Sequence, residues 1–208
     1  MDGVFMKKFF ILIITILLVV SFFGAAGIWK DKQSLQDSIL RLHVVGNSDS
    51  EYDQQVKLRL KDKLVEYLQP ITDSFSDKEQ VMQYIREHLE ELRAYADGFL
   101  ESIGVSERVK VHLRQESFDT REYDTFTLPA GVYDALRIEI GDAEGKNWWC
   151  VTFPSLCLPA TSREFHDTAV SSGFSETLTN SLTGKKQYRY RFFILDCIGK
   201  LENFFAKY

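Results

Sequence analysis

Histidine and carboxylate side chains lie near each other in the sequence at two places where they could act as general acid and base. His43 is followed by Asn47 and Asp49, and His112 is followed by Arg114 and Asp119. A histidine beside a carboxylate is a common arrangement for proton transfer in hydrolases. The sequence has no Gly-x-Ser-x-Gly, His-Glu-x-x-His or cysteine–histidine motif to anchor such a mechanism. We therefore predict no enzymatic activity and keep a secreted hydrolase as the alternative.

The acidic residues also have a structural interpretation. The segment from Ser48 to Glu51 matches a capping box, in which Ser48 caps a helix and Glu51 reaches back to free amides. The spacing of Asp49, Glu51 and Asp53 lacks the glycine and the distal glutamate of a calcium loop, and the cysteine spacing does not fit zinc. We predict no metal site and no cofactor.

Residues 145–157 hold two of the three tryptophans and two of the three cysteines. A predicted turn at 142–145 precedes this segment, and Phe153-Pro154 ends it. Trp148 and Trp149 would point to opposite faces of a strand, so we expect one in the core and the other available to a partner, with the packing of both inside the protein as the alternative. An outward tryptophan would be the strongest single anchor for docking.

Residues 1–29 have the features of an export signal or a membrane anchor. Lys7-Lys8 precedes an apolar run, Phe9 to Phe23, that is interrupted by Thr15 and Ser21 and followed by small residues. The pattern fits either a signal peptide cleaved near Ala26 or an uncleaved anchor. Both alternatives place the remaining chain outside the cytoplasm.

An exported location allows cysteines to oxidise, and we predict a disulfide between Cys150 and Cys157. Cys197 is left over, and we predict that it is a small buried residue on a helical apolar stripe. The net charge is −5, with no cluster of lysine and arginine. Nucleic acid is therefore a poor partner, anionic lipid and anionic wall polymers are poor candidates for simple electrostatic attraction, and a protein partner fits.

The predicted elements give one α+β domain over residues 39–208, joined to the N-terminus by a polar linker at 30–38. We predict an antiparallel sheet covered on one face by two long amphipathic helices. The helices are expected at 52–68, where Pro70 stops the first, and at 79–103, where Gly104 stops the second. Ser76 is the expected cap of the second helix, because 76–79 repeats the capping-box pattern.

The predicted strands begin with 39–45, in which Arg41 and His43 share a face. A strand at 109–113 and an antiparallel hairpin of 136–140 with 148–153 follow. We expect an irregular segment at about 154–187 with one short helix at 175–182, then a strand at 188–192. A terminal helix should present Leu195, Ile198, Leu201 and Phe205 on its inner side.

Six residues are candidates for binding a protein partner. Arg121 could offer its guanidinium fork to a carboxylate, and aromatic or amide side chains in the same regions would surround it. The candidates are Arg121, Tyr123, Tyr133, Asn147, Trp148 and Trp149.

Four segments resemble the stage II sporulation protein R family in order and spacing. They are LRLHVVGNSD at 40–49, FDTREY at 118–123, LPAGVYDA at 128–135 and NWWCVTFPSLC at 147–157. The resemblance covers roughly residues 39 to 157. Gly46 stands where the family usually has alanine, and Asp119 and Ser155 stand where it usually has proline. Little can be matched at 158–186.

This resemblance implies a signalling protein made in the forespore and exported to the space between two membranes. There it would trigger a membrane-bound, aspartic-type protease that leads to processing of the sigma-E precursor, acting as a ligand without turnover. A secreted cell-wall hydrolase, a wall-binding module and a membrane-anchored structural subunit remain alternatives.

Overall fold

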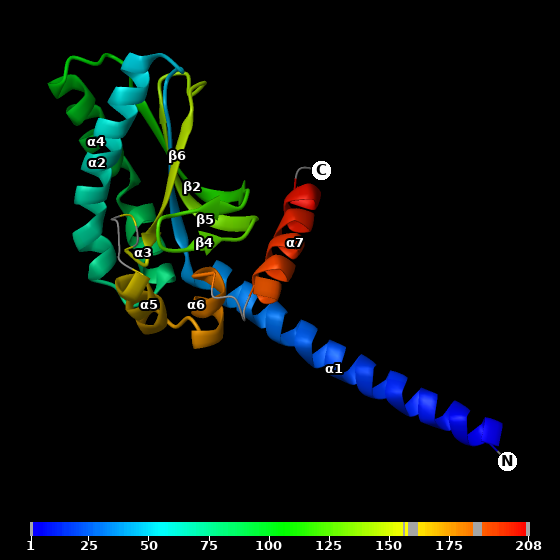
Figure 1. Ribbon diagram of the computed structural model, residues 1–208. Helices are drawn as coiled ribbons and strands as arrows, with labels where there is room; N and C mark the ends of the chain where they lie inside the picture. Colours follow the sequence, from blue (N-terminus) through cyan, green and yellow to red (C-terminus); the bar gives the residue numbers. More distant parts are fainter. Residues whose placement is uncertain (1, 156, 158–161, 185–188, 207–208) are drawn as a thin grey trace.

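The centre of the molecule is a four-stranded sheet in the order β2-β5-β1-β6, shown in Figure 1. The computed structural model describes residues 2–155, 157, 162–184 and 189–206. The four strands are β1 (Leu40–Val45), β2 (Val109–Phe118), β5 (Gly131–Ile140) and β6 (Asn147–Phe153). The structure is α+β, as predicted.

The sheet is mixed, so the prediction of a wholly antiparallel sheet is wrong. β1 is parallel to β5, whereas β1 pairs with β6 and β2 pairs with β5 in antiparallel fashion. The predicted hairpin of β5 with β6 is also wrong, because β1 lies between them.

The turn that joins β5 to β6 explains this insertion, since it binds the end of β1. The amides of Glu144 and Gly145 donate to the carbonyl oxygens of Asn47 and Gly46 at 3.0 and 2.9 Å. A Cβ atom on Gly145 would lie 2.3 Å from the carbonyl oxygen of Ser48, so this approach requires glycine. The hydrophobic alternation of β5 and β6 predicts two strands but not the strand that separates them.

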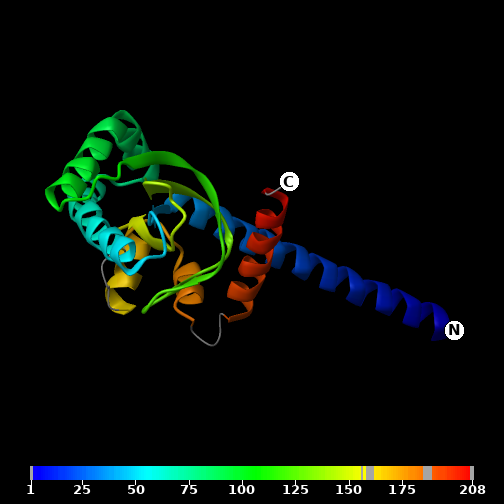
Figure 2. The same cartoon turned by 90° about the horizontal axis from the view of Figure 1, so that it is seen from above.

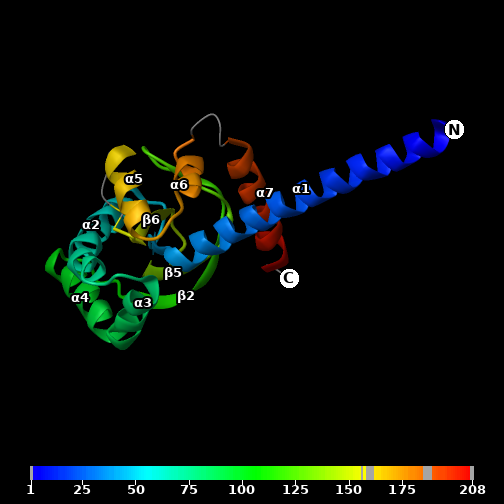
Figure 3. The ribbon, with the colours of Figure 1, turned by 90° about the horizontal axis from the view of Figure 1, so that it is seen from below.

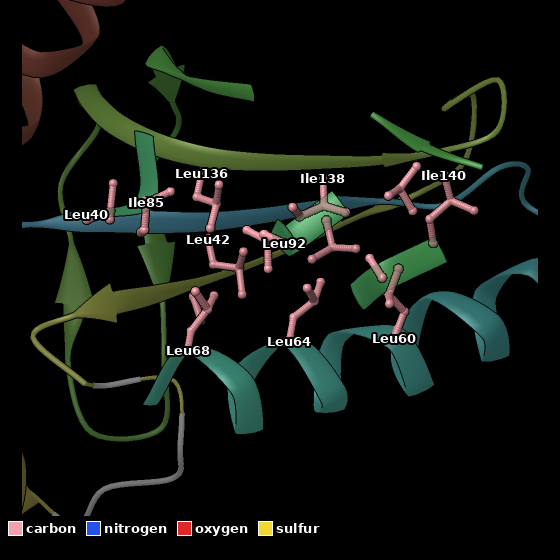
Figure 4. Packing of buried hydrophobic residues seen from close by; sticks show 14 of the residues in the cluster. Leu40, Leu42, Leu60, Leu64, Leu68, Ile85, Leu92, Leu136, Ile138 and Ile140 are labelled. Carbon is pink, nitrogen blue, oxygen red and sulfur yellow. The ribbon is translucent and has the colours of Figure 1, made fainter. Parts of the chain in front are cut away.

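Three helices cover one face of the sheet: α2 (Glu51–Asp73), α3 (Lys78–Glu87) and α4 (Leu89–Ser102). Leu60, Leu64 and Leu68 repeat every four residues on α2 and are fully buried or nearly so. Figure 4 shows their side chains pointing toward Leu42 and Ile138 of the sheet. We call this side of the sheet the helix face.

Two helix boundaries differ from the prediction. Pro70 lies inside α2 and does not stop it. The second long helix is divided at His88, whose backbone N–H donates to Tyr84 and Ile85 carbonyls at the end of α3 and whose carbonyl accepts from Leu92 in α4.

The helix caps lie one or two residues later than predicted. Ser50, not Ser48, caps α2 by accepting from the amide of Asp53. Asp77, not Ser76, caps α3 by accepting from the amide of Gln80.

The opposite face of the sheet is partly covered by the C-terminal helices and by the end of α1, which corrects the prediction of cover on one face. These elements are α5 (Ser162–Ser171), α6 (Glu176–Leu182) and α7 (Arg189–Ala206), with a two-stranded sheet of β3 (Arg121–Glu122) and β4 (Thr127–Leu128) beside them. They enclose a second apolar cluster that includes Ile39, Phe118, Phe165 and Leu178.

The C-terminal segment confirms one prediction and corrects two. The short helix is present as α6, with Ser175 as its cap. The predicted strand at 188–192 is wrong for 189–192, which form the start of α7, and Tyr188 lies outside the described residues. The expected irregular segment at 154–187 contains α5 as well as α6, and several of its residues also lie outside the described part.

The inner side of α7 matches the predicted apolar stripe only in part, because Leu195 and Ile198 pack against the second apolar cluster but the other two residues do not. Leu195 is buried, but Leu201 and Phe205 are 60% and 72% exposed. Gly199 faces the domain instead, where a Cβ atom would lie 1.6 Å from the carbonyl oxygen of Ala130. The close approach at Gly199 therefore sets which side of α7 turns inward.

The N-terminal segment forms one continuous helix, α1 (Asp2–Ser38). The stretch predicted as a polar linker is the end of this helix, and Ile28 and Leu35 are buried against the domain. The rest of α1 projects away from the domain in Figures 1 and 2. Among the helices as described, none combines the length and hydropathy needed to cross a bilayer.

Cys150 and Cys157 form a disulfide, with their Cα atoms 5.2 Å apart. The bond ties β6 to the residues that follow Pro154. Cys197 is free and half-buried.

Candidate functional site

Part of the second sheet face is left accessible beyond the C-terminal helices and carries charged and aromatic side chains. One row of cross-strand partners crosses all four strands: His112, Arg137, His43 and Trp149. We call this surface the polar face and define it by His43, His112, Glu116, Arg121, Arg137, Glu139, Asn147 and Trp149.

His43 is the buried centre of the polar face. Its Nδ1 lies 2.7 Å from Glu116 Oε2 and its Nε2 lies 2.8 Å from Asn147 Oδ1. Arg137 Nη1 also lies 3.1 Å from Nδ1. Both ring nitrogens thus contact groups of the protein, and the residue is 6% exposed. His43 has no free nitrogen to offer to a substrate.

Glu116 is held in its charged form by its neighbours. Burial alone would raise the pKa of this carboxyl, but hydrogen bonds from His43 and Arg114 and the charges of His43 and Arg137 outweigh it. The pKa of Glu116 is lowered to about 2. The polar face therefore contains a fixed carboxylate at neutral pH, surrounded by cationic groups.

Trp149 contacts two cationic or ionisable side chains. The guanidinium carbon of Arg121 lies 3.7 Å from the centre of the indole ring, and the ring of His43 stacks at 5.5 Å between centroids. Both Arg121 and Trp149 are half-buried. Within the described residues, Arg121 has no carboxylate within ion-pair distance. Its guanidinium is positioned by stacking and remains available to an acidic group.

Arg41 lies at the border between the polar face and the second apolar cluster. It is fully buried, with its guanidinium carbon 3.8 Å from the centre of the Phe118 ring, and Nη2 donates to the Tyr123 hydroxyl at 3.1 Å. Within the described residues, its Nε and Nη1 have no hydrogen-bond acceptor. Burial accordingly lowers the pKa of Arg41, although nearby Tyr123 and Tyr133 act in the opposite direction.

The proposed catalytic grouping of His43 with Asn47 and Asp49 does not assemble. Asn47 Oδ1 accepts from the amide of Asp142 at 3.0 Å, and Asp49 Oδ1 accepts from the amide of Lys146 at 2.7 Å. Both residues hold the turn between β5 and β6 and do not join His43 as a catalytic set. His112 lies on the polar face, where Nε2 is 3.7 Å from Glu139.

The described residues contain no group of three or more histidine, cysteine, aspartate or glutamate side chains that could hold a metal ion. The geometry of the polar face instead suits contact with another macromolecule. It combines a fixed carboxylate, several cationic groups and an aromatic ring on one accessible surface.

The structure brings together three of the six residues proposed to bind a partner. Arg121 and Trp149 stack, and Asn147 lies beside them through His43. Trp148 lies on the helix face, half-buried, with the Lys61 ammonium 5.1 Å from its ring centre.

The two tyrosines lie deeper. Tyr123 is half-buried and stacks on Phe126 at 4.6 Å between ring centres. Tyr133 is 2% exposed, and its hydroxyl donates to the carbonyl oxygen of Pro129 at 2.9 Å. Its side chain therefore lies inside the domain, away from the accessible part of the polar face.

The strands that build this site lie within the part of the chain that matches a known protein family. Residues 36–163, which include β1, β2, β5 and β6, match the family described as stage II sporulation protein R. The chain belongs to this family. It is 32% identical over 197 residues to Stage II sporulation protein R of Bacillus subtilis (strain 168), covering 88% of this chain and 87% of that protein. No solved structure matches.

In this member of the stage II sporulation protein R family, three residues of the polar face were not predicted: Glu116, Arg137 and Glu139. The sequence signal that could have identified them is the alternation of polar residues on β2 and β5, which indicates strands with one accessible face. The order of the strands was needed to place these residues beside His43.

Proposed function

We propose that this protein is secreted from the forespore into the intermembrane space, or is anchored there by its N-terminal segment with the domain outside the cytoplasm. In that space it activates a membrane-embedded protease, which leads to processing of the sigma-E precursor. The protein acts as a ligand and performs no turnover of its own. Its membership of a sporulation family supports the biological setting.

The observation that carries the proposal is the stacked pair of Arg121 and Trp149 on the polar face. Tryptophan and arginine are the residue types that most often dominate the binding energy of protein interfaces. The pair is half-buried, so it is already ordered before a partner arrives. A pre-ordered side chain loses less conformational entropy on binding than a mobile one.

The charge of the polar face indicates the chemistry of the partner surface. Arg121 is half-buried and has no acidic partner among the described residues, whereas the carboxylates of Glu116 and Glu139 are already engaged by Arg137 and its neighbours. An acidic side chain of the protease would find an available guanidinium at Arg121. Binding that is stronger in the active state of the protease would shift its population toward that state.

A secreted wall hydrolase is the second candidate, because His43 and Glu116 form a close histidine–carboxylate pair. His43 is buried and Glu116 is half-buried, and both ring nitrogens of His43 contact protein atoms. Release of soluble fragments from peptidoglycan by the purified protein would favour this candidate, provided that Glu116→Gln abolishes the release in a folded variant.

The test of the signalling role is processing of the sigma-E precursor in cells that express its protease together with this protein. Arg121→Ala and Trp149→Ala should each reduce processing at least tenfold at equal secreted levels. Arg121→Lys should also impair it, because lysine keeps the charge but loses the planar stacking surface. Arg93→Ala is the matched control, since Arg93 is a half-exposed arginine on α4, on the other side of the sheet.

The outcomes of this experiment test the activator role and the contact surface on the polar face separately. Processing that depends on the wild-type protein but is unchanged by Arg121→Ala and Trp149→Ala would keep the activator role and exclude this contact surface. No processing with the wild-type protein would contradict the activator role itself.

A further inference from the structure

The side of the C-terminal helix α7 that faces the domain combines polar and small residues with Leu195, Phe192 and Ile198, whereas other large apolar side chains of α7 are turned outward. Asp196, Gly199 and Asn203 are buried on the inner side. The outer face of α7, which we define by five side chains, is between 37% and 72% exposed. These residues are Tyr190, Phe193, Ile194, Leu201 and Phe205.

The inner side of α7 is fixed by polar contacts. Asp196 Oδ1 accepts from the amide of Ala130 at 2.8 Å and from the Thr120 hydroxyl. Asn203 Nδ2 donates to the carbonyl oxygen of Phe118 at 2.7 Å. The helix therefore cannot rotate its apolar side inward without breaking these bonds and forcing larger side chains into the space at Gly199.

The outer face of α7 is not isolated, because α7 crosses α1 at the point where α1 leaves the domain. Arg191 of α7 pairs with Asp31, and Glu202 pairs with Lys32 at 2.7 Å. Figures 2 and 3 show α7 crossing α1, whose N-terminal part projects beyond it.

The part of α1 beyond this crossing has exposed apolar side chains of its own. Phe9, Ile11, Leu12 and Ile16 are each more than half exposed. Trp29 and Lys30 lie next to the crossing and are also exposed. Tryptophan and lysine beside an apolar run are typical of the boundary between a bilayer and water.

We propose that the outer face of α7 lies in the surface of a lipid bilayer, beside the apolar part of α1. A helix with an aromatic and aliphatic face that crosses a projecting apolar helix has the orientation of an interfacial helix. The bilayer is favoured over a second copy of the chain because two apolar surfaces, one on each helix, meet on the same side of the domain. The arrangement does not require α1 to cross the bilayer and does not depend on the proposed signalling role.

The charges near the crossing indicate how this binding should respond to lipid composition. Arg191, Lys32 and Lys200 are paired with Asp31, Glu202 and Asp196 respectively. Paired charges attract anionic lipid weakly and the exposed Lys30 adds a single cation, so apolar burial should supply most of the binding. The partition coefficient should be similar on neutral and anionic vesicles.

The first measurement is flotation of the full chain with vesicles of phosphatidylcholine and, separately, of phosphatidylethanolamine with phosphatidylglycerol. The triple variant Phe193→Ser, Leu201→Ser, Phe205→Ser should partition at least tenfold less than the wild-type protein on both. The double variant Tyr52→Ser, Leu58→Ser is the matched control, since it removes exposed apolar residues from α2. This control should stay within about twofold of the wild-type protein.

The wild-type protein and the triple variant both retain α1, so a local probe is needed to measure the contribution of α7 separately. An environment-sensitive fluorophore at Phe205→Cys, in a Cys197→Ser background, should shift its emission to the blue when vesicles are added. The same probe at Tyr52→Cys should not shift. Emission at position 205 that stays water-like while the protein floats would overturn the proposal.

Two further results would also overturn it. Binding that requires anionic lipid and disappears in high salt would show electrostatic attachment, not apolar burial. A triple variant that floats normally but loses self-association in sedimentation would show that the outer face of α7 contacts a second copy of the chain.

Discussion

The two faces of the sheet are built from alternate residues of the same strands, yet they are covered in different ways. On the helix face, Leu42 and Leu136 pack beneath the leucines of α2 in a continuous aliphatic core. On the opposite face, the neighbouring residues His43 and Arg137 belong to the polar face, and the second apolar cluster occupies the remainder.

Within each strand, residues on one face therefore contribute mainly to stability and residues on the other face mainly to recognition of a partner. A residue on the helix face contributes mainly by excluding water, whereas its sequence neighbour on the polar face contributes charge and shape that a partner can contact. Trp148 and Trp149 show the contrast directly, because adjacent tryptophans lie on opposite faces. Substitutions at adjacent positions should therefore have separable effects on folding and on signalling.

The largest effect is expected on the helix face. Leu64 is fully buried, so Leu64→Ala should lower the free energy of unfolding by about 3 to 4 kcal/mol through lost burial and a residual cavity. Chemical denaturation would measure the change. Leu58→Ala, on the same helix but 45% exposed, is the control and should change stability by less than about 1 kcal/mol. Equal losses at both positions would contradict the description of this face.

An intermediate effect is expected at Arg41, at the border between the polar face and the second apolar cluster. Arg41→Ala should cost about 2 to 3 kcal/mol, because it removes the side chain that packs on Phe118. Arg41→Met should change stability by less than about 1 kcal/mol, because methionine keeps most of the packing and removes a buried cation with unsatisfied N–H groups. Thermal and chemical unfolding of both variants would test this ranking. A loss in Arg41→Met as large as that in Arg41→Ala would show that the charge of Arg41, and not the packing of its side chain, stabilises the fold.

The smallest effect is expected on the polar face and should depend on pH. The pKa of Glu116 is lowered from 4.5 to about 2, so its stabilisation is complete above about pH 4.5 and is lost as the pH falls toward 2. Glu116→Gln should therefore lower the unfolding free energy by about 1 to 2 kcal/mol at pH 6, after allowing for solvent screening.

The difference between wild type and Glu116→Gln should shrink between pH 4.5 and pH 2. Denaturation at several pH values would measure it, with Glu101→Gln as an exposed control. A difference that stays constant across this range would exclude the ionised carboxylate as its cause.

The sequence predicted patterns within single helices and strands better than it predicted which strands pair. The leucine repeat of α2, the shared face of Arg41 and His43 and the helix at α6 follow from spacing along one element, and the structure confirms them. The place of β1 between β5 and β6 depends on the contacts of Glu144 with Asn47 and of Gly145 with Gly46, which join residues almost a hundred positions apart in the sequence. Periodicity carries no information about such contacts.

The candidate site was predicted in part for the same reason. Arg121, Asn147 and Trp149 were identified from residue type and family resemblance, and the structure brings them together. Glu116 was not, because its role depends on two strands that lie on either side of β5. The orientation of α7 was predicted only in part: Leu195 and Ile198 pack inward as expected, whereas Leu201 and Phe205 point outward because the close approach at Gly199 sets the inner side.

The position of β1 has a consequence for the order in which this chain can fold. β1 ends at Val45, but its two neighbours in the sheet begin at Gly131 and Asn147. This inner strand is therefore the first of the four to be synthesised but must wait for both of its neighbours, and closing such long loops slows folding relative to local pairing. A growing chain can form α2, α3 and α4 early, but those helices have no complete sheet to cover until β6 has been made.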